Sequence, residues 1–127
     1  MSTLGNELPK EDGENEAISD MEAFKTQRDL RHRLFFHHKE WEFGPALLTD
    51  NIRLARAQHK PQEAITYYEE ARSTAKALVE NFGEAEYVPA WLEVNRVLAE
   101  IYSLVDQSDK SVFYAREGLM ALKKGRF

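Results

Sequence analysis

The fold of this chain is decided by residues 98–119, which read LAEIYSLVDQSDKSVFYAREGL. Apolar residues recur here at three- and four-residue spacing on either side of a polar turn at residues 106–109, which predicts two helices joined by a short loop. The second helix carries the small residues Ser111 and Gly118 seven positions apart, on one face, so the first helix can pack closely against it. We therefore expect a hairpin of two antiparallel helices.

A second copy of this pattern lies earlier in the chain. Sliding the sequence against itself by 47 residues brings the two helix pairs into one register, which is typical of an internal repeat. The superposed pairs are Leu47 with Val94, Leu54 with Ile101, Ala64 with Ser111, Ile65 with Val112, Tyr67 with Tyr114, Glu70 with Glu117 and Ala71 with Gly118.

The repeated segment resembles a tetratricopeptide repeat. Residues 98–102 read Leu-Ala-x-x-Tyr and residues 111–119 read Ser-Val-x-Tyr-Ala-x-x-Gly-Leu, as in the two helices of that family. Residues 64–71 repeat the second helix as Ala-Ile-x-x-Tyr-x-x-Ala, but Ala55 stands at the large aromatic position of the first. The 47-residue offset exceeds the family's usual period of roughly 34, so longer helices are expected. The resemblance covers about residues 45–123 and implies a right-handed superhelical stack of two antiparallel hairpins; the alternative is a plain antiparallel bundle.

Proline, glycine and capping residues set the expected boundaries of an all-α fold with about five helices. Ser19 and Glu22 have the spacing of a capping box and predict the start of the first helix, and Gly83 predicts the end of the third. Residues 1–17 are expected to form a flexible acidic tail and residues 18–127 a single helical domain. The expected helices cover about residues 20–40, 45–58, 61–82, 88–106 and 108–123.

Composition and charge restrict the classes of function. The tail carries most of the net charge of −5, and the nearly neutral body has no recognition motif beside its basic residues, so we expect no nucleic-acid binding. No apolar run approaches the roughly 20 residues that cross a bilayer, so we expect no membrane span. The chain has no cysteine, which permits a reducing compartment, and we expect a cytoplasmic protein.

The residues of an active site are also missing from the sequence. Without cysteine, a Gly-x-Ser-x-Gly elbow or a glycine-rich phosphate loop, we expect no enzyme and no cofactor. His32 and His37 are five residues apart and should diverge on an α-helix, so we expect no metal site and imidazoles that pack on aromatic rings instead. Basic residues around helices one and two are expected on solvated faces; they are Arg28, Arg31, Arg33, Arg53, Arg56 and Lys60.

The family resemblance points to binding residues. The first helix of each tetratricopeptide pair usually lines a concave groove that holds a peptide. The Lys and Asn clamp of the chaperone-binding members is not present, so the expected ligand is not a chaperone tail but a partner with acidic side chains. The resemblance implies as partner-binding residues Thr49, Arg53 and Arg56 from one copy and Glu93, Arg96 and Glu100 from the other.

We therefore expect a non-catalytic protein–protein interaction module, an adaptor, chaperone or assembly factor that binds another protein or a peptide. One alternative is a regulatory helical domain that senses a ligand or peptide, and another is a small helical-bundle metalloprotein with a centre near His32 and His37. Two repeats are short for such a stack, and Phe113, Met120 and Phe127 lie near its end. These features predict a homodimer.

Overall fold

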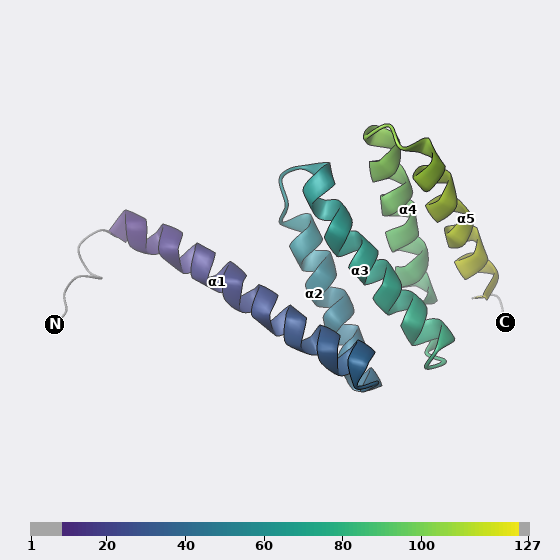
Figure 1. Ribbon diagram of the computed structural model, residues 1–127, viewed down its shortest axis with the longest axis horizontal. Coiled ribbons are helices and arrows are strands. Elements are labelled where there is room, and N and C mark those ends of the chain that lie inside the picture. The colour runs from purple at the N-terminus through teal and green to yellow at the C-terminus, as the bar shows by residue number, and fades with distance from the viewer. Residues whose placement is uncertain (1–8, 125–127) are drawn as a thin grey trace.

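Within residues 9–124, which the computed structural model describes, every regular element is a helix. Four helices stand side by side, and the first reaches away from them at its N-terminal end (Figure 1). None of the helices in this part of the chain is long and apolar enough to cross a membrane. The α-helices are α1 (Pro9–His32), α2 (Gly44–Arg56), α3 (Pro61–Glu80), α4 (Val88–Leu104) and α5 (Ser108–Lys124).

Proline and glycine set the boundaries of the body. Pro45, Pro61 and Pro89 lie in the first turns of α2, α3 and α4, where the missing N–H of proline breaks no helical hydrogen bond. Gly83 follows α3 with a φ of 70°, a left-handed conformation that favours glycine. The expected ends of these helices are confirmed to within about two residues.

The expected start of the first helix is wrong. The helix runs through Ser19 instead of beginning after it, and Pro9 occupies its first position. Residues 9–17, which we placed in the tail, are helical, and residues 1–8 lie outside the described residues. Lysine and glutamate are good helix formers, so a segment with little to bury still takes helical backbone. The helix then widens into a π-helical turn at Arg33–His37.

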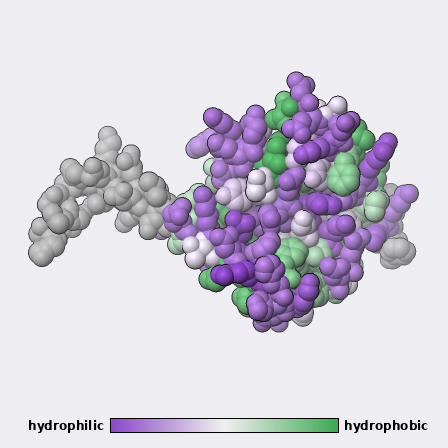
Figure 2. All heavy atoms as spheres, viewed as in Figure 1, coloured by the Kyte–Doolittle hydropathy of each residue, from purple (hydrophilic) through white to green (hydrophobic). Residues whose placement is uncertain are grey.

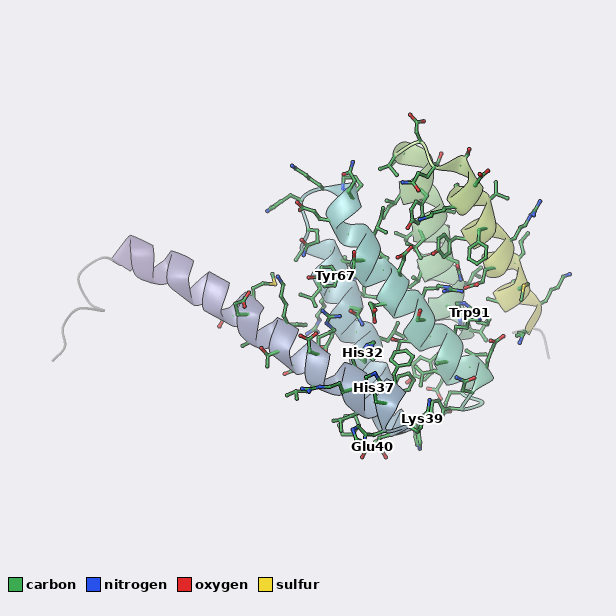
Figure 3. The ribbon with its side chains drawn as sticks, in the orientation of Figure 1. His32, His37, Lys39, Glu40, Tyr67 and Trp91 are labelled. Atoms are coloured by element: carbon green, nitrogen blue, oxygen red, sulfur yellow. The ribbon has the colours of Figure 1, made fainter. Side chains whose placement is uncertain are left out.

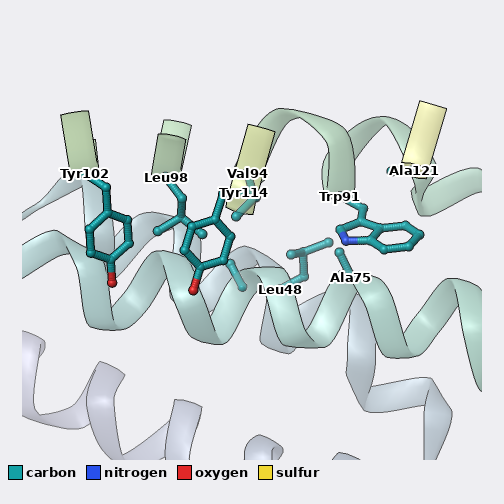
Figure 4. Close-up of a cluster of buried hydrophobic side chains, with 9 residues drawn as sticks. Leu48, Ala75, Trp91, Val94, Leu98, Tyr102, Tyr114 and Ala121 are labelled. Carbon is teal, nitrogen blue, oxygen red and sulfur yellow. The ribbon is translucent and has the colours of Figure 1, made fainter. Parts of the chain in front are cut away.

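The helices α2–α3 and α4–α5 form two antiparallel hairpins that share one apolar core (Figure 1). Trp91 and Leu98 of α4 are fully buried against Ala71 and Ala75 of α3, with Leu48 of α2 in the same cluster (Figure 4). One part of the core therefore lies between the hairpins, and a second cluster of Phe35, Leu47, Ala77 and Leu78 lies between the helices of the first hairpin and the π-helical turn. Ser111 and Gly118 of α5 have the role expected of them, since Ser111 Oγ donates to the Ala99 carbonyl of α4 at 2.7 Å and a Cβ on Gly118 would lie 3.5 Å from Leu92 of the same helix.

The turns that lead into the hairpins repeat at a spacing of 44 residues. Lys39 and Gly83 both have positive φ, 58° and 70°. In the next position, Glu40 N donates to Leu34 O at 3.0 Å and Glu84 N donates to Leu78 O at 2.8 Å. A 3₁₀ turn then enters the first helix of each hairpin, at Trp41–Phe43 and at Ala85–Tyr87. The same backbone device thus builds both entrances.

The first helices of the hairpins follow this 44-residue spacing, so our superposition of Leu47 on Val94 is wrong. Leu47 corresponds to Trp91, and both side chains are fully buried. Asn51 corresponds to Asn95, and each donates its Nδ2 to the carbonyl four residues earlier, at 3.2 and 3.0 Å. A shift of three residues keeps nearly the same helix face, so apolar periodicity could not separate the two registers.

The second helices follow the expected 47-residue spacing, because α4 has 17 residues where α2 has 13 and adds about one turn. Arg28 of α1 lies over the Tyr67 ring of α3 at 5.5 Å, and Arg72 of α3 lies over the Tyr114 ring of α5 at 5.7 Å. Arg72 is 44 residues after Arg28, and Tyr114 is 47 residues after Tyr67. The helix α1 therefore relates to α3 as α3 relates to α5.

Candidate functional site

The three candidates on α2 form one exposed stripe. Thr49, Arg53 and Arg56 lie four and three residues apart, on the side of α2 that is turned away from the core. Thr49 Oγ1 donates to the Pro45 carbonyl at 3.2 Å. Arg53 borders a groove of about 240 Å³ between α1 and α2, whose apolar wall includes Met21, Phe24 and Leu54. The helix α1 thus flanks this stripe.

The three candidates on α4 form a second exposed stripe with internal ion pairs. Arg96 Nε donates to Glu93 Oε1 at 2.9 Å, and Arg96 Nη1 donates to Glu100. The hydrogen bond from Arg96 lowers the pKa of Glu93, against the opposing effect of desolvation, and the same bond, which Glu93 accepts, raises the pKa of Arg96. An acidic partner would have to compete with both glutamates for Arg96, so Arg53 and Arg56 supply the accessible positive charge.

The two stripes lie near each other but border different grooves. Leu48 and Ile52 of α2 pack into the same cluster as Trp91 of α4, so the two helices are neighbours. The charge of Arg56 also contributes to the lowered pKa of Glu93, after the hydrogen bond from Arg96. The stripes therefore share one electrostatic field, while the groove beside Arg53 involves α1 and the groove beside Arg96 involves α5.

The groove beside Arg96 was not predicted from the sequence. It has a volume of about 270 Å³ and lies between α4 and α5; we call it the α4–α5 groove. Gly118 is buried in it, and Leu119 on its edge is 61% exposed. Large exposed apolar residues are informative when they cluster, and several of those on the described residues belong to α5. The groove is lined by Leu92, Arg96, Ala99, Ala115, Gly118 and Leu119, among others.

A buried polar network behind the groove joins three helices. Arg72 of α3 donates two hydrogen bonds to Glu117 of α5, at 2.5 and 2.6 Å, and Trp91 Nε1 of α4 donates to the same carboxylate at 3.0 Å. Burial would raise the pKa of Glu117, but the hydrogen bonds from Arg72 and Trp91 outweigh it and the pKa lies below its usual value. The 47-residue repeat singled out Glu117 but gave no sign of this role.

Two tyrosines share a second carboxylate. Tyr102 and Tyr114 stack with ring centroids 5.5 Å apart, and both hydroxyls donate to Glu69 of α3. Burial, together with the neighbouring Glu69, raises the pKa of Tyr114 to about 12. These hydroxyls stay protonated at neutral pH and serve as donors, which fixes the orientation of α4 and α5 against α3.

The prediction that His32 and His37 diverge is wrong, whereas the prediction that an imidazole packs on an aromatic ring is confirmed. The ring centroids of His32 and His37 are 6.0 Å apart, because the π-helical turn brings residues five apart onto one side (Figure 3). His32 packs on Phe36 with a centroid distance of 4.8 Å, as expected, and its Nδ1 lies 3.1 Å from Glu70 Oε2. Among the described residues, no three histidine, aspartate or glutamate side chains are grouped as metal ligands.

The expected solvated face of the first helix is also partly wrong. Arg31 Nη1 donates to Asp50 Oδ2 at 2.7 Å, and the Asp50 side chain is only 3% exposed. Arg28 is largely covered, beside Asp29 and over Tyr67. These arginines attach α1 to the first hairpin because buried Asp50 requires a charged partner.

The comparisons with known proteins assign no family to the chain. The face shown in Figure 2 is mostly hydrophilic, with hydrophobic residues in small separate patches. The chain matches no family model, no curated protein and no solved structure. The homodimer prediction rested on three residues near the end of the stack. Two of them, Phe113 and Met120, are about half exposed on α5, while Phe127 lies outside the described residues.

Proposed function

We propose that this protein is a non-catalytic, tetratricopeptide-like interaction module that binds a partner polypeptide. The observation that carries the proposal is the pair of exposed stripes on the adjacent helices α2 and α4, whose side chains take no part in the core. Rigid helices hold these side chains in place, so binding costs little ordering entropy. Charges select the partner, and nearby apolar contacts supply most of the affinity.

The experiment compares partner capture by the wild type and by the Arg53→Glu, Arg96→Glu double variant from the native cell. We expect the variant to lose partners that the wild type retains, with unchanged helicity by circular dichroism, because both positions are exposed. The matched control is Arg33→Glu with Lys60→Glu, which makes the same charge change at exposed positions outside the stripes. Equal capture by the stripe variant and the wild type would contradict the proposal.

A ligand-sensing regulatory domain is the second candidate, and the apolar groove between α1 and α2 favours it. Its volume of about 240 Å³ is below the roughly 300–1,000 Å³ of typical small-molecule sites. A thermal-shift screen with small metabolites separates the two functions, because a ligand that binds only the folded state raises the unfolding temperature. Localisation in the cytoplasm remains a prediction, to be checked by cell fractionation.

A further inference from the structure

Each hairpin turns an equivalent face toward the C-terminal end of the stack, and within residues 9–124 only the first of these faces is covered. In the first hairpin, Leu48 and Ile52 of α2 and Ala71 of α3 lie under α4. The spacings of 44 and 47 residues place Leu92, Arg96 and Gly118 at the corresponding positions of the second hairpin. Those three residues line the α4–α5 groove. The packing on the first face therefore shows which kind of side chains can cover the second.

The amphipathic helix α4 supplies most of the apolar cover of the first face, and Tyr114 and Ala121 of α5 complete it. Its residues Trp91, Val94 and Leu98 are at most 3% exposed and lie at positions i, i+3 and i+7. At position i+11, the hydroxyl of Tyr102 donates to the carboxylate of Glu69 on α3. The apolar stripe supplies burial, and the polar contact at its end fixes the register of the helix.

The second face differs from the first in the charge at the register position. The residue that corresponds to Glu69 is Arg116, which is exposed on α5, one turn from Leu119. A tyrosine hydroxyl donates to a carboxylate, but a guanidinium only donates and requires an acceptor. An occupant of the second face would therefore carry a carboxylate where α4 carries Tyr102.

The second face also lacks the group that holds a further hairpin. In the first hairpin, Arg72 binds Glu117, which belongs to the second helix of the next hairpin. The residue that corresponds to Arg72 is Leu119, an apolar side chain. The face therefore fits one helix rather than another pair of helices.

We propose that the α4–α5 groove binds a single amphipathic helix of a partner polypeptide, with large apolar residues at positions i, i+3 and i+7 and a carboxylate at i+11. A second copy bound through the same face would bring its own exposed Arg116, which only donates, and not the carboxylate that Arg116 requires. The inference rests on the proposed function, because it names the chemistry of a partner and a surface on which the partner docks.

The probes are synthetic peptides with the sequence of residues 88–105, one with Tyr102→Glu and one with Tyr102→Lys. We expect saturable binding of the glutamate peptide to the full chain, about threefold to tenfold tighter than binding of the lysine peptide. In the Arg116→Glu protein this preference should reverse. Equal affinities for the two peptides, or an unchanged preference in Arg116→Glu, would overturn the proposal, and so would the absence of saturable binding.

A matched pair of protein variants tests the location of the groove. Leu119 lines it, whereas Leu30 is 49% exposed on α1, which packs against α2 and not against α5. We expect Leu119→Asp to weaken binding of the glutamate peptide by more than about tenfold and Leu30→Asp to leave it unchanged, since only Leu119 loses an apolar contact with the peptide. Circular dichroism checks that both variants fold; equal weakening would overturn the assignment.

Analytical sedimentation tests whether a second copy of this chain, and not a partner helix, covers the groove. A wild-type dimer that Leu119→Asp converts to a monomer would show that a second copy covers the groove and would overturn the partner-helix proposal. A wild-type monomer together with the expected peptide preference supports it. If the peptides fail but the Arg53→Glu, Arg96→Glu variant still loses its partners, only this inference falls and the proposed function stands.

Discussion

The two hairpins share one backbone plan but differ in how tightly they are attached to the helix before them. Between α3 and α5, the Glu117 carboxylate receives three hydrogen bonds and its side chain is 8% exposed. At the corresponding position between α1 and α3, Glu70 is 33% exposed, and its Oε2 lies 3.1 Å from His32 Nδ1. A repeated pattern thus gives a strong polar contact only where the neighbouring helices supply the donors.

The entrances of the hairpins differ in the volume of two side chains. Gly44 begins α2 beneath Phe35, and a Cβ added to it would lie 2.6 Å from the Phe35 ring and 2.6 Å from Leu78. In the second hairpin, Val88 corresponds to Gly44 and Val79 corresponds to Phe35. The first hairpin thus combines a large residue with glycine where the second has two valines, so the two entrances distribute side-chain volume differently.

The largest expected effect tests the difference between the carboxylates. Glu117→Ala should lower the free energy of unfolding by about 3 kcal/mol, because it leaves the Arg72 charge and the Trp91 N–H without their acceptor. Glu70→Ala should cost less than about 1 kcal/mol, since its carboxylate is partly solvated. Urea unfolding followed by circular dichroism measures both. Equal losses would remove the contrast between the two interfaces.

The packing of the entrances is tested by exchanging side chains between hairpins. Gly44→Val should lower the free energy of unfolding by about 2 kcal/mol, because the side chain meets Phe35 and Leu78 in a filled core. Adding Phe35→Val copies the second hairpin and removes the clash with the Phe35 ring, while the contact with Leu78 remains. The double variant should therefore lose less stability than the sum of the two single variants, by about 1 kcal/mol.

The matched control for this double-mutant cycle is Gly118→Ala, at a buried glycine of α5. A Cβ on Gly118 would meet Asn95 and Leu92 at 3.5 Å, an ordinary van der Waals distance. Gly118→Ala should therefore be tolerated, and its coupling to Phe35→Val should be near zero. If the stability losses of Gly44→Val and Phe35→Val simply add in the double variant, the side-chain volumes at positions 35 and 44 do not compensate for each other.

Much of the fold followed from the sequence, because its determinants are local. Pro45, Pro61 and Gly83 mark helix ends through their own backbone chemistry, and these ends are confirmed. The capping-box spacing at Ser19 and Glu22 misled us, since such a pattern permits a helix start without requiring one.

The register and the groove were harder to predict because they depend on contacts between segments. The three-residue difference between the two spacings leaves Leu47 on the same helix face in either alignment, and only the burial of Trp91 and the matching hydrogen bonds of Asn51 and Asn95 decide between them.

The six stripe residues were predicted as exposed positions of α2 and α4, and their role as a binding site remains a prediction. The open groove depends on which face of α5 is left uncovered, and periodicity alone does not determine this.

A smaller effect is expected in acid. Since the folded pKa of Glu117 is lowered, its ionised form stabilises the fold above the ordinary carboxyl pKa, and this contribution is lost as the pH falls through the folded pKa. The wild type should therefore approach the stability of Glu117→Gln as the pH drops below about 4. Urea unfolding from pH 7 to pH 3 measures the gap between them. A constant gap would mean that Glu117 contributes through packing and not through its charge.

The smallest effect concerns the turns that precede the hairpins. Lys39 has the left-handed conformation that Gly83 has in the second turn, and a side chain makes this conformation costly by about 1–2 kcal/mol. Lys39→Gly should raise the unfolding temperature by about 2–4 °C, because the relief exceeds the added entropy of glycine in the unfolded chain. Gly83→Ala should lower the unfolding temperature. Nothing lies within 4 Å of the added Cβ, so any loss of stability comes from the backbone strain of alanine at positive φ and not from a steric clash. If Lys39→Gly lowers the unfolding temperature, the lysine side chain stabilises the first turn by more than its backbone strain costs, and the two turns are equivalent in geometry but not in energy.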